Sequence, residues 1–400
     1  MSAPWDAVVV GAGPAGSAAA LTLAAKGRRV LVLEKDCFPR RKVCGAFLAA
    51  DGVEALGSLG LLETVRRAGP EVIREGSVQL PDGRSVPLPL NAPALGVSRY
   101  LLDGELARGA AEAGAEIRFG ARVVSARGGV KARRVSWVDA DGVHDGASRV
   151  VIGAWGRWDA LDRSLGRAFL KERRYFGWSA ELSGDSLFLA GRVRLYLFRG
   201  GYCGLSRVEG GRVNLAGVIS EKQRRKAGPG WELVLEGIRR ENRTLDRDLA
   251  GLRISSDGFL GTGPVFFTAK PPVEGGVLMA GDAAGVLDPF SGEGQSAALA
   301  SGLLAAEASE AALSGAIPID RLARLYTRAW KARFGRRFSW SSIFRRLMLN
   351  PGAASIAARV AGERLTSFAI GRLSSSRKAF NSQITNHKSQ IHDSQFTIHN

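Results

Sequence analysis

The chain has 400 residues, enough for a large core and two domains or more, and its net charge of +18 comes mostly from arginines scattered through an Ala- and Gly-rich sequence. Its four His, three of them near the C-terminus, and its three scattered Cys exclude a His-based metal site, a Ser-His-Asp triad and a disulfide framework. With no leader sequence and no run of about 18 apolar residues, we expect a cytoplasmic protein without a metal.

The first predicted strand, at residues 8–10, runs into a glycine-rich turn and a helix of small residues, and a second apolar strand follows at 29–33. Glycines at this spacing allow a tight turn, close approach of the backbone to a pyrophosphate and close helix–strand packing. Glu34 ends the second strand, where a carboxylate can accept hydrogen bonds from a ribose diol. This order of elements predicts a dinucleotide site. The residues of the turn and helix that carry it are Gly11, Gly13, Ala15 and Gly16.

The next motif, at residues 38–48, reads Phe-Pro-Arg-Arg-Lys-Val-Cys-Gly-Ala-Phe-Leu. A buried free cysteine is usually a small apolar filler, so Cys44 either lines a site or takes a direct chemical part in it. Arg41 and Lys42 are either solvated or face an anionic group. Further along, residues 97–123 contain Arg99, a predicted helix and a predicted strand that reaches Val123.

The middle of the chain has the alternating apolar pattern of an antiparallel sheet. Residues 77–80 and 86–88 form a predicted hairpin around Pro-Asp-Gly-Arg, and 192–198 form a predicted strand. Residues 205–208 and 213–218, joined by Glu-Gly-Gly-Arg, form a second predicted hairpin.

A second glycine-rich region lies at residues 276–294, where an apolar strand runs into Asp282 and then a loop with Gly292 and Gly294. An Ala-rich helix begins at about Gln295. Asp282 at a strand end can bond a sugar-alcohol hydroxyl, and the glycine backbone can lie against a flat ring. The other interpretation is an Asp that caps a helix beside a flexible loop.

Four stretches, the first strand–turn–helix unit with Glu34 and the segments 38–48, 97–123 and 276–294, together resemble the FAD-dependent oxidoreductases of the aromatic hydroxylase type. They resemble the geranylgeranyl reductase-like branch of these proteins more closely. The resemblance implies an α/β fold: a Rossmann-like FAD-binding domain, a mostly antiparallel β-sheet substrate domain and a helical C-terminal region. It implies FAD rather than NAD as the cofactor. In such a protein Cys44 and Gly45 lie beside the flavin ring, Arg99 lies over the cofactor, and the Val123 backbone lies near the adenine. Arg99 is otherwise an ordinary surface ion-pair partner.

No catalytic side chain is assigned, because a cofactor of this kind carries the hard chemistry itself. The helix N-terminus after the glycine loop is expected to point N–H donors at the flavin N1/O2 edge and to stabilise its reduced state. The candidate cofactor-binding residues are Gly11, Gly13, Ala15, Gly16, Glu34, Cys44, Gly45, Arg99, Val123, Asp282, Gly292, Gly294 and Gln295.

The sequence departs from its apparent family at two places. Trp155 stands where related hydroxylases have the Asp of a Gly-Ala-Asp-Gly element, which puts direct NAD(P)H use in doubt. The Tyr-x-Trp-x-Phe-Pro run of geranylgeranyl reductases is replaced by Tyr-Cys-Gly-Leu-Ser from Tyr202, and the Trp-x-Trp-x-Ile-Pro of flavin halogenases is absent. Trp178, Tyr202 and Cys203 lie in the predicted substrate region but are equally consistent with core packing.

The order of elements predicts a division of the chain. Residues 1–68, 97–159 and 257–312 form the FAD-binding domain, and 69–96 and 160–256 form the substrate domain. A helical region follows at 313–380, and the Ser/Gln/Asn-rich tail at 381–400 is predicted to be disordered.

Residues 320–348 predict an amphipathic helix in which aromatic and basic residues alternate at three- and four-residue steps. The helix either packs on the FAD domain with a solvated basic face or rests peripherally on an anionic membrane. No nucleic acid is expected as a partner, since no recognised RNA or DNA module accompanies the charge.

Three functions follow from these features. The first is hydride transfer from flavin to a double bond of a small hydrophobic, prenyl- or lipid-like substrate. The second is hydroxylation of a small aromatic or polyketide-like substrate by a monooxygenase. The third is a flavin-binding protein without activity at a membrane or RNA surface. NAD(P)H and an electron-donor protein are both candidates for the source of electrons.

Overall fold

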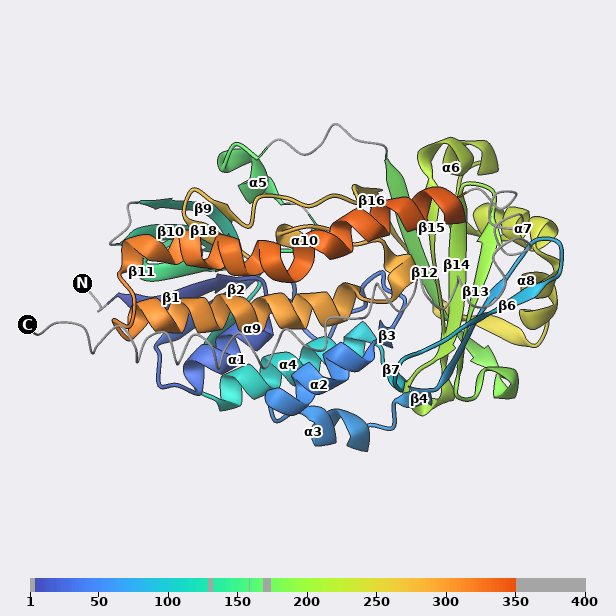
Figure 1. Cartoon of the computed structure of the whole chain (residues 1–400), viewed down its shortest axis with the longest axis horizontal. Helices are drawn as coiled ribbons and strands as arrows, with labels where there is room; N and C mark the ends of the chain where they lie inside the picture. Colours follow the sequence, from blue (N-terminus) through green and yellow to red (C-terminus); the bar gives the residue numbers. More distant parts are fainter. Residues whose placement is uncertain (1–3, 129–131, 158, 168–173, 350–400) are drawn as a thin grey trace, which may run out of the picture.

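The protein contains two large sheets with helices packed on them (Figure 1). The computed structural model describes residues 4–128, 132–157, 159–167 and 174–349. The predicted disordered tail at 381–400, and any helix beyond residue 349, lie outside the described residues.

The first sheet has parallel strands at its centre and lies at the same end of the molecule as the N-terminus (Figure 1). Residues of β2 are buried along the whole strand. Such continuous burial requires cover on both faces, which explains the unbroken Val/Leu pattern of this strand. In spatial order the main strands are β17 (Val273–Glu274), β18 (Val277–Met279), β11 (Gly142–Gly153), β1 (Trp5–Val10), β2 (Val30–Glu34) and β8 (Glu116–Phe119); β10 (Arg133–Asp139) pairs with β11, and β9 (Arg122–Gly128) with β10.

Small residues allow the helices of this domain to pack closely. A Cβ added at Gly302 would lie 2.1 Å from the carbonyl oxygen of Ala15, so helices α1 and α9 approach each other backbone to backbone. The helices are α1 (Pro14–Ala24), α2 (Ala50–Ser58), α3 (Leu62–Arg67), α4 (Arg99–Glu112), α5 (Ala160–Ser164), α9 (Gly294–Leu313) and α10 (Leu322–Met348).

The second sheet is mostly antiparallel, with β5 parallel to β13 as the exception. Its order is β16 (Leu252–Val265), β12 (Tyr175–Gly184), β15 (Val213–Ser220), β14 (Gly201–Arg207), β13 (Arg192–Phe198), β5 (Glu75–Gln79) and β6 (Ser85–Leu88). The outer helices are α6 (Glu221–Ala227), α7 (Trp231–Glu241) and α8 (Arg243–Asp248). Both predicted hairpins, at 77–88 and at 205–218, are confirmed.

Side chains of the second sheet alternate between its two faces, as the strand period requires. Tyr196 and Cys203 are paired across β13 and β14 and belong to the core beneath the outer helices. Leu197 and Tyr202, one residue away on each strand, belong to the core on the opposite face. Cys203 therefore faces away from the side on which Tyr202 lies.

The structure corrects two of the predicted domain boundaries. Strand β16 pairs with β12 from Leu252 to Val265, so the second sheet continues past the boundary at 257. Helix α5 carries Leu161, which is buried in the core of the first sheet rather than in the substrate domain. The 69–96 segment is also divided: β4 (Glu71–Ile73) and β7 (Ala94–Gly96) form a small separate sheet with β3 (Phe47–Leu48).

Helix α10 packs its aromatic row onto the first domain. Tyr326, Trp330 and Phe334 are each at most 5% exposed and belong to the core of the first sheet. The hydroxyl of Tyr326 donates a hydrogen bond of 2.6 Å to the carbonyl oxygen of Met279 at the end of β18. The apolar face of this helix therefore packs on the FAD domain, as the first of the two interpretations predicted. Within the described ranges, no helix has both the length and the apolar character needed to cross a bilayer.

Candidate cofactor and substrate site

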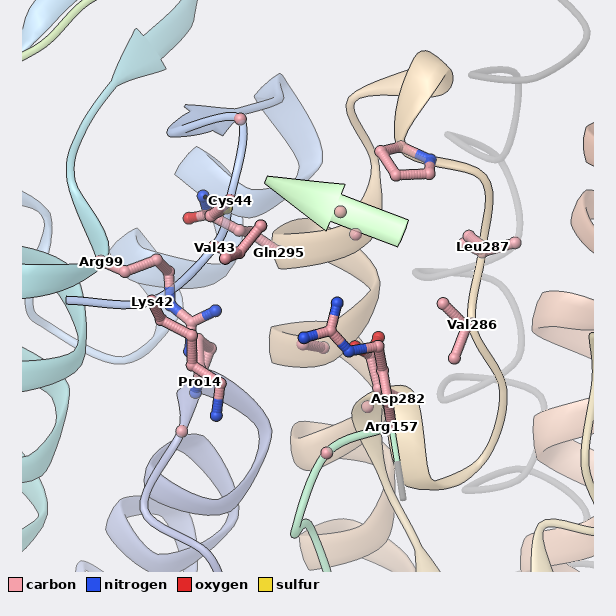
Figure 2. A pocket seen from close by; sticks show the side chains of 18 of the residues that line it. Pro14, Lys42, Val43, Cys44, Arg99, Arg157, Asp282, Val286, Leu287 and Gln295 are labelled. Carbon is pink, nitrogen blue, oxygen red and sulfur yellow. Dashed lines mark hydrogen bonds between the residues drawn. The ribbon is translucent and has the colours of Figure 1, made fainter. Parts of the chain in front are cut away.

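A large pocket lies where the two sheets meet. It is bordered by the carboxyl ends of β1 and β2, by residues 42–45, by the N-termini of α1, α4 and α9, and by strands of the second sheet (Figure 2). All of the predicted cofactor-binding residues line this pocket except Gly16.

The glycines of the first turn have different roles. Gly11 has a φ of +101°, and a Cβ there would lie 2.5 Å from the carbonyl oxygen of Ala154. A Cβ at Gly16 would lie 1.8 Å from the Gly11 carbonyl oxygen, so Gly16 serves helix–strand packing. Gly13 borders the pocket. A Cβ added at Gly13 would have the Arg99 guanidinium, 3.7 Å away, as its nearest neighbour. Gly13 thus leaves free space in front of the N-terminus of α1, where unpaired N–H groups attract phosphate.

Glu34 closes this end of the pocket. Its carboxylate is 4% exposed, and it accepts hydrogen bonds from the backbone N–H of Ala12 at 2.7 Å and of Asp36 at 3.0 Å. Val123 also lines the pocket. Each carboxylate oxygen can accept more than one hydrogen bond, so Glu34 retains the capacity to bind a ribose hydroxyl.

Arg99 belongs to a buried ion pair rather than to the surface. Its guanidinium donates two hydrogen bonds to the Asp103 carboxylate, at 2.6 and 2.7 Å. Arg40 donates a third, at 3.0 Å, to the same carboxylate, which is 1% exposed. Arg40 also lies 3.1 Å from the Asp36 carboxylate and 3.8 Å from that of Glu34, so charges of both signs form one network on this side of the pocket.

Lys42 is one further cation on this side of the pocket, and its surroundings differ from those of Arg41. Lys42 lines the pocket beside Pro14 and Arg99 (Figure 2) and forms no hydrogen bond with any residue that the structure describes. Burial, and then the charges of Arg40 and Arg99, lower the pKa of Lys42 to about 8. Arg41 instead turns outward and donates to the carbonyl oxygens of residues 257 and 258.

Polar groups without partners face the middle of the pocket. The Gln295 side chain donates a hydrogen bond of 3.1 Å to the Cys44 sulfur, while its Oε1 is buried and has no hydrogen-bond partner (Figure 2). An added Cβ at Gly45 or Gly294 would meet open space. A buried acceptor beside two glycines is suited to a flat ring with polar edges, because such a ring satisfies the acceptor and needs the space of the missing side chains. These residues therefore fit the isoalloxazine of FAD.

Asp282 and Arg157 lie together on the other side of the pocket (Figure 2). In the described part of the chain no side chain pairs with the Asp282 carboxylate, which is free to accept from a sugar-alcohol hydroxyl. The Asp282 carbonyl oxygen accepts a hydrogen bond of 3.0 Å from Lys270. Arg157 donates a hydrogen bond of 2.7 Å to the Thr262 hydroxyl, and burial lowers its pKa.

Beyond these polar groups the pocket becomes apolar. Its far wall consists of side chains from the second sheet and from the loop that precedes α9. Two residues of this loop, Val286 and Leu287, are shown in Figure 2. The apolar lining residues are Leu88, Leu90, Val193, Leu195, Val218, Val265, Phe267, Val286, Leu287 and Phe290. Tyr202 and Trp178 also line the pocket, whereas Cys203 does not.

Several pocket residues were not assigned from the sequence. Arg40 and Arg157 were missed, although Arg40 stands in the 38–48 motif and Arg157 follows the departure at Trp155. The apolar wall was missed because its members come from separate segments and each resembles a core residue in its local pattern.

Comparison with known proteins identifies the family. The FAD binding domain family matches residues 5–187. A menaquinone reductase of Mycobacterium tuberculosis is 32% identical over 364 residues, which cover 86% of this chain and 83% of that protein. A digeranylgeranylglycerophospholipid reductase of Methanosarcina mazei is 27% identical and covers 88% of this chain and 86% of its own length.

Solved structures share the fold. A geranylgeranyl bacteriochlorophyll reductase-like protein of Thermoplasma acidophilum superposes with a TM-score of 0.76 at 20% identity, over 97% of this chain and 99% of that one. A flavin-dependent brominase superposes with a TM-score of 0.77 at 20% identity, over 98% and 99%. The predicted fold class, FAD as cofactor and an oxidoreductase activity are thereby confirmed. This chain belongs to the FAD-dependent oxidoreductases, in their geranylgeranyl reductase-like branch.

Proposed function

We propose that this protein reduces a carbon–carbon double bond in a prenyl- or lipid-like substrate. The observation that carries the proposal is the continuity of the pocket, which runs from the polar groups around Cys44 and Gln295 to an apolar wall. Apolar side chains bind hydrocarbon by excluding water and offer no polar group that would select a small hydroxylated ring. Menaquinone and digeranylgeranylglycerophospholipid, which name the two relatives, both contain isoprenoid chains.

The residues of the wall hold the substrate without placing a new charge against it. Tyr202 donates a hydrogen bond of 2.7 Å to the Asp288 carboxylate, and burial raises the pKa of Tyr202 well above its ordinary value. The phenol therefore keeps its proton at neutral pH. FAD, when bound and reduced, would supply a hydride equivalent to one carbon of the double bond, and a proton that originates from solvent would complete the other; the chain binds and positions the substrate.

An anaerobic assay tests this proposal. Protein reduced with dithionite is mixed with a prenylated quinone, with a geranylgeranyl lipid or with a quinone that lacks the prenyl chain. We expect the two prenylated compounds to gain two hydrogen atoms in a carbon–carbon bond, as measured by mass spectrometry. Hydroxylated product that forms only when oxygen is admitted would instead show the alternative function, a monooxygenase acting on a small aromatic or polyketide-like substrate.

A substitution in the apolar wall tests whether this wall binds the substrate. Leu90→Asn places an amide in the apolar wall, and we expect KM for a prenylated substrate to rise about tenfold, because burying the side chain against hydrocarbon is worth about 1.5 kcal/mol or more. Val143→Asn is the control, since Val143 is 73% exposed and lies outside the pocket. An unchanged KM in Leu90→Asn would remove the wall from the substrate site.

We further propose that electrons come from a donor protein rather than from NAD(P)H. Trp155 lines the pocket, and its indole N–H donates a hydrogen bond of 3.1 Å to Asp162, which does not line it. The position therefore offers no carboxylate to the cofactor. Anaerobic mixing with NADPH or NADH should leave the flavin absorbance nearly unchanged over the time of turnover; rapid bleaching would contradict a protein donor.

A lipid substrate also suggests peripheral contact with an anionic membrane. Arg324, Arg328 and Lys331 lie four and three residues apart on α10, and all three are exposed. Basic residues at this spacing share one face of a helix and are attracted by anionic lipid.

A further inference from the structure

Glu293 stands inside the glycine loop that faces the middle of the pocket. It lies between Gly292 and Gly294, is the residue that precedes helix α9, and lines the pocket while only 6% exposed. The partial positive charge of a helix N-terminus stabilises the negative charge of a reduced flavin. An ionised Glu293 opposes that stabilisation, and a protonated Glu293 does not.

The neighbours of Glu293 only partly compensate its charge. Its nearest cation is Arg337 of α10, with Nη1 3.9 Å from the Glu293 carboxylate. Arg337 is shared, since it donates a hydrogen bond of 3.0 Å to Asp51 of α2. Arg333, one turn earlier on α10, lies near the same group of charges. No hydrogen-bond donor among the described residues reaches the Glu293 carboxylate.

Burial raises the pKa of Glu293 to about 7, with Arg337 acting to lower it and Asp51 to raise it. A carboxyl with this pKa changes its protonation near neutral pH. A second negative charge placed against the same helix N-terminus raises the pKa of a carboxyl further, because like charges disfavour ionisation.

We propose that Glu293 takes up a proton from solvent when the flavin bound against its loop is reduced, so that this residue couples flavin reduction to pH. The two electrons come from the donor and reside on the flavin, and the proton resides on the Glu293 carboxyl oxygen. Glu293 acts here as a positioning residue that sets the charge of the loop. The inference rests on the flavin site and not on the identity of the substrate.

The flavin midpoint potential, measured by spectroelectrochemical titration from about pH 6 to about pH 9, tests this coupling. The range begins below the Glu293 pKa of about 7 and extends above it. For a two-electron couple, each additional proton taken up adds about 30 mV per tenfold change in proton activity. We expect the wild-type slope to be steeper than that of Glu293→Gln just above pH 7, by an amount that approaches this value. Equal slopes in two proteins that both hold FAD would overturn the proposal.

Two further variants control for general effects of burial and charge. Glu307→Gln changes a carboxyl on the same helix whose pKa burial also raises, but which lies outside the pocket, and should keep the wild-type slope. Arg337→Met removes the cation that lowers the Glu293 pKa, and should move the steep region to higher pH. If Glu293→Gln fails to bind FAD, an unshifted Arg337→Met profile overturns the proposal. The proposed function can fail independently of this coupling: a protein that does not saturate a prenyl chain should still show the slopes described here.

Discussion

Lys42 is a residue through which we expect pH to affect cofactor binding. Its ammonium group lies in the pocket near the N-terminus of α1, together with Arg40 and Arg99, and has no hydrogen-bond partner among the described residues. A cation held in this way is available to an anionic group, and the pyrophosphate of FAD is the anion that the glycine turn predicts.

Lys42→Met should therefore weaken FAD binding. A hydrogen bond to a charged group is worth about 1.5–3 kcal/mol, which corresponds to a Kd about 10- to 100-fold higher. Fluorescence titration of the apoprotein measures this Kd. Arg41→Met, one residue away but outside the pocket, is the matched control and should bind FAD like the wild type. Equal affinities in all three proteins would show that Lys42 does not contact the cofactor.

The same residue predicts a pH dependence. The Lys42 pKa of about 8 means that its positive charge is present below this pH and is lost as the pH rises through it. FAD affinity should therefore fall above about pH 8 in the wild type, and this fall should be absent in Lys42→Met. A wild-type affinity that stays constant across this range would contradict the role assigned to the ammonium group.

Glycines of the two loops should respond differently to substitution. Gly294→Asp projects a charged side chain into open space in the pocket, at a helix N-terminus where an acidic residue does not weaken the helix. We expect the apoprotein to keep its thermal stability and FAD binding to be lost. Gly16→Ala, whose Cβ would lie 1.8 Å from a carbonyl oxygen, should destabilise the fold itself by about 3 kcal/mol or more. A Gly294→Asp protein that retains FAD with an unchanged potential would refute this placement of the loop.

Much of the polar half of the site could be predicted from the sequence, because its residues sit at fixed positions in local motifs. Cys44 and Gln295 are far apart in sequence, yet each was assigned from its own motif, and the structure brings their side chains within hydrogen-bond distance. The spacing of the first turn predicted one glycine for close helix–strand packing, and Gly16 has this place in the structure.

Helix α10 has one row of buried aromatic residues and another row of exposed basic residues. Its apolar row was predictable from the spacing of Tyr326, Trp330 and Phe334, but periodicity alone does not say whether such a row packs on protein or on lipid. The hydrogen bond from Tyr326 to the end of β18 places the row on protein.

Trp330→Ala tests this packing. Trp330 is 5% exposed, and truncating a buried Trp typically costs 3–5 kcal/mol. The free energy of unfolding, from urea titration, should fall by about this amount. Lys331→Ala, the exposed neighbour, should stay within about 0.5 kcal/mol of the wild type. A Trp330→Ala protein as stable as the wild type would mean that α10 is not docked as described.

The exposed row of the same helix carries the proposed membrane contact. Replacing Arg324, Arg328 and Lys331 together by Gln should weaken sedimentation with anionic vesicles at least tenfold, since each cation contributes about 1 kcal/mol near such a surface. Neutral vesicles are the control, and binding to them should be weak for both proteins. Anionic vesicles that bind the triple variant as well as the wild type would refute the contact.

Strand β16 marks where element boundaries could not be predicted. The strand runs through the predicted boundary at 257 because its pairing with β12 continues on both sides of it. That pairing is between segments about 80 residues apart, and no local pattern in residues 252–265 records it. The two hairpins were predicted correctly, because each of their strands pairs with the next strand in the sequence and the local pattern contains both partners.

At the scale of the whole molecule, function depends on the junction between the two sheets. The first sheet and its helices provide the polar half of the pocket, and the second sheet with the loop before α9 provides the apolar wall. The fold class and the cofactor could be derived from the sequence, since they follow from motifs in chain order. The apolar wall could not, because it exists only where Leu195, Val265, Phe267 and Leu287 from three separate segments come together.

The central claim is that one pocket holds FAD and a prenyl chain side by side. An anaerobic single-turnover experiment tests it most directly: the protein is reduced, the excess reductant is removed, and a prenylated substrate is added while the flavin absorbance is followed. We predict that the oxidised flavin band returns without oxygen, at the rate at which saturated product forms. A flavin that stays reduced until oxygen is admitted, with no saturated product, would contradict the claim.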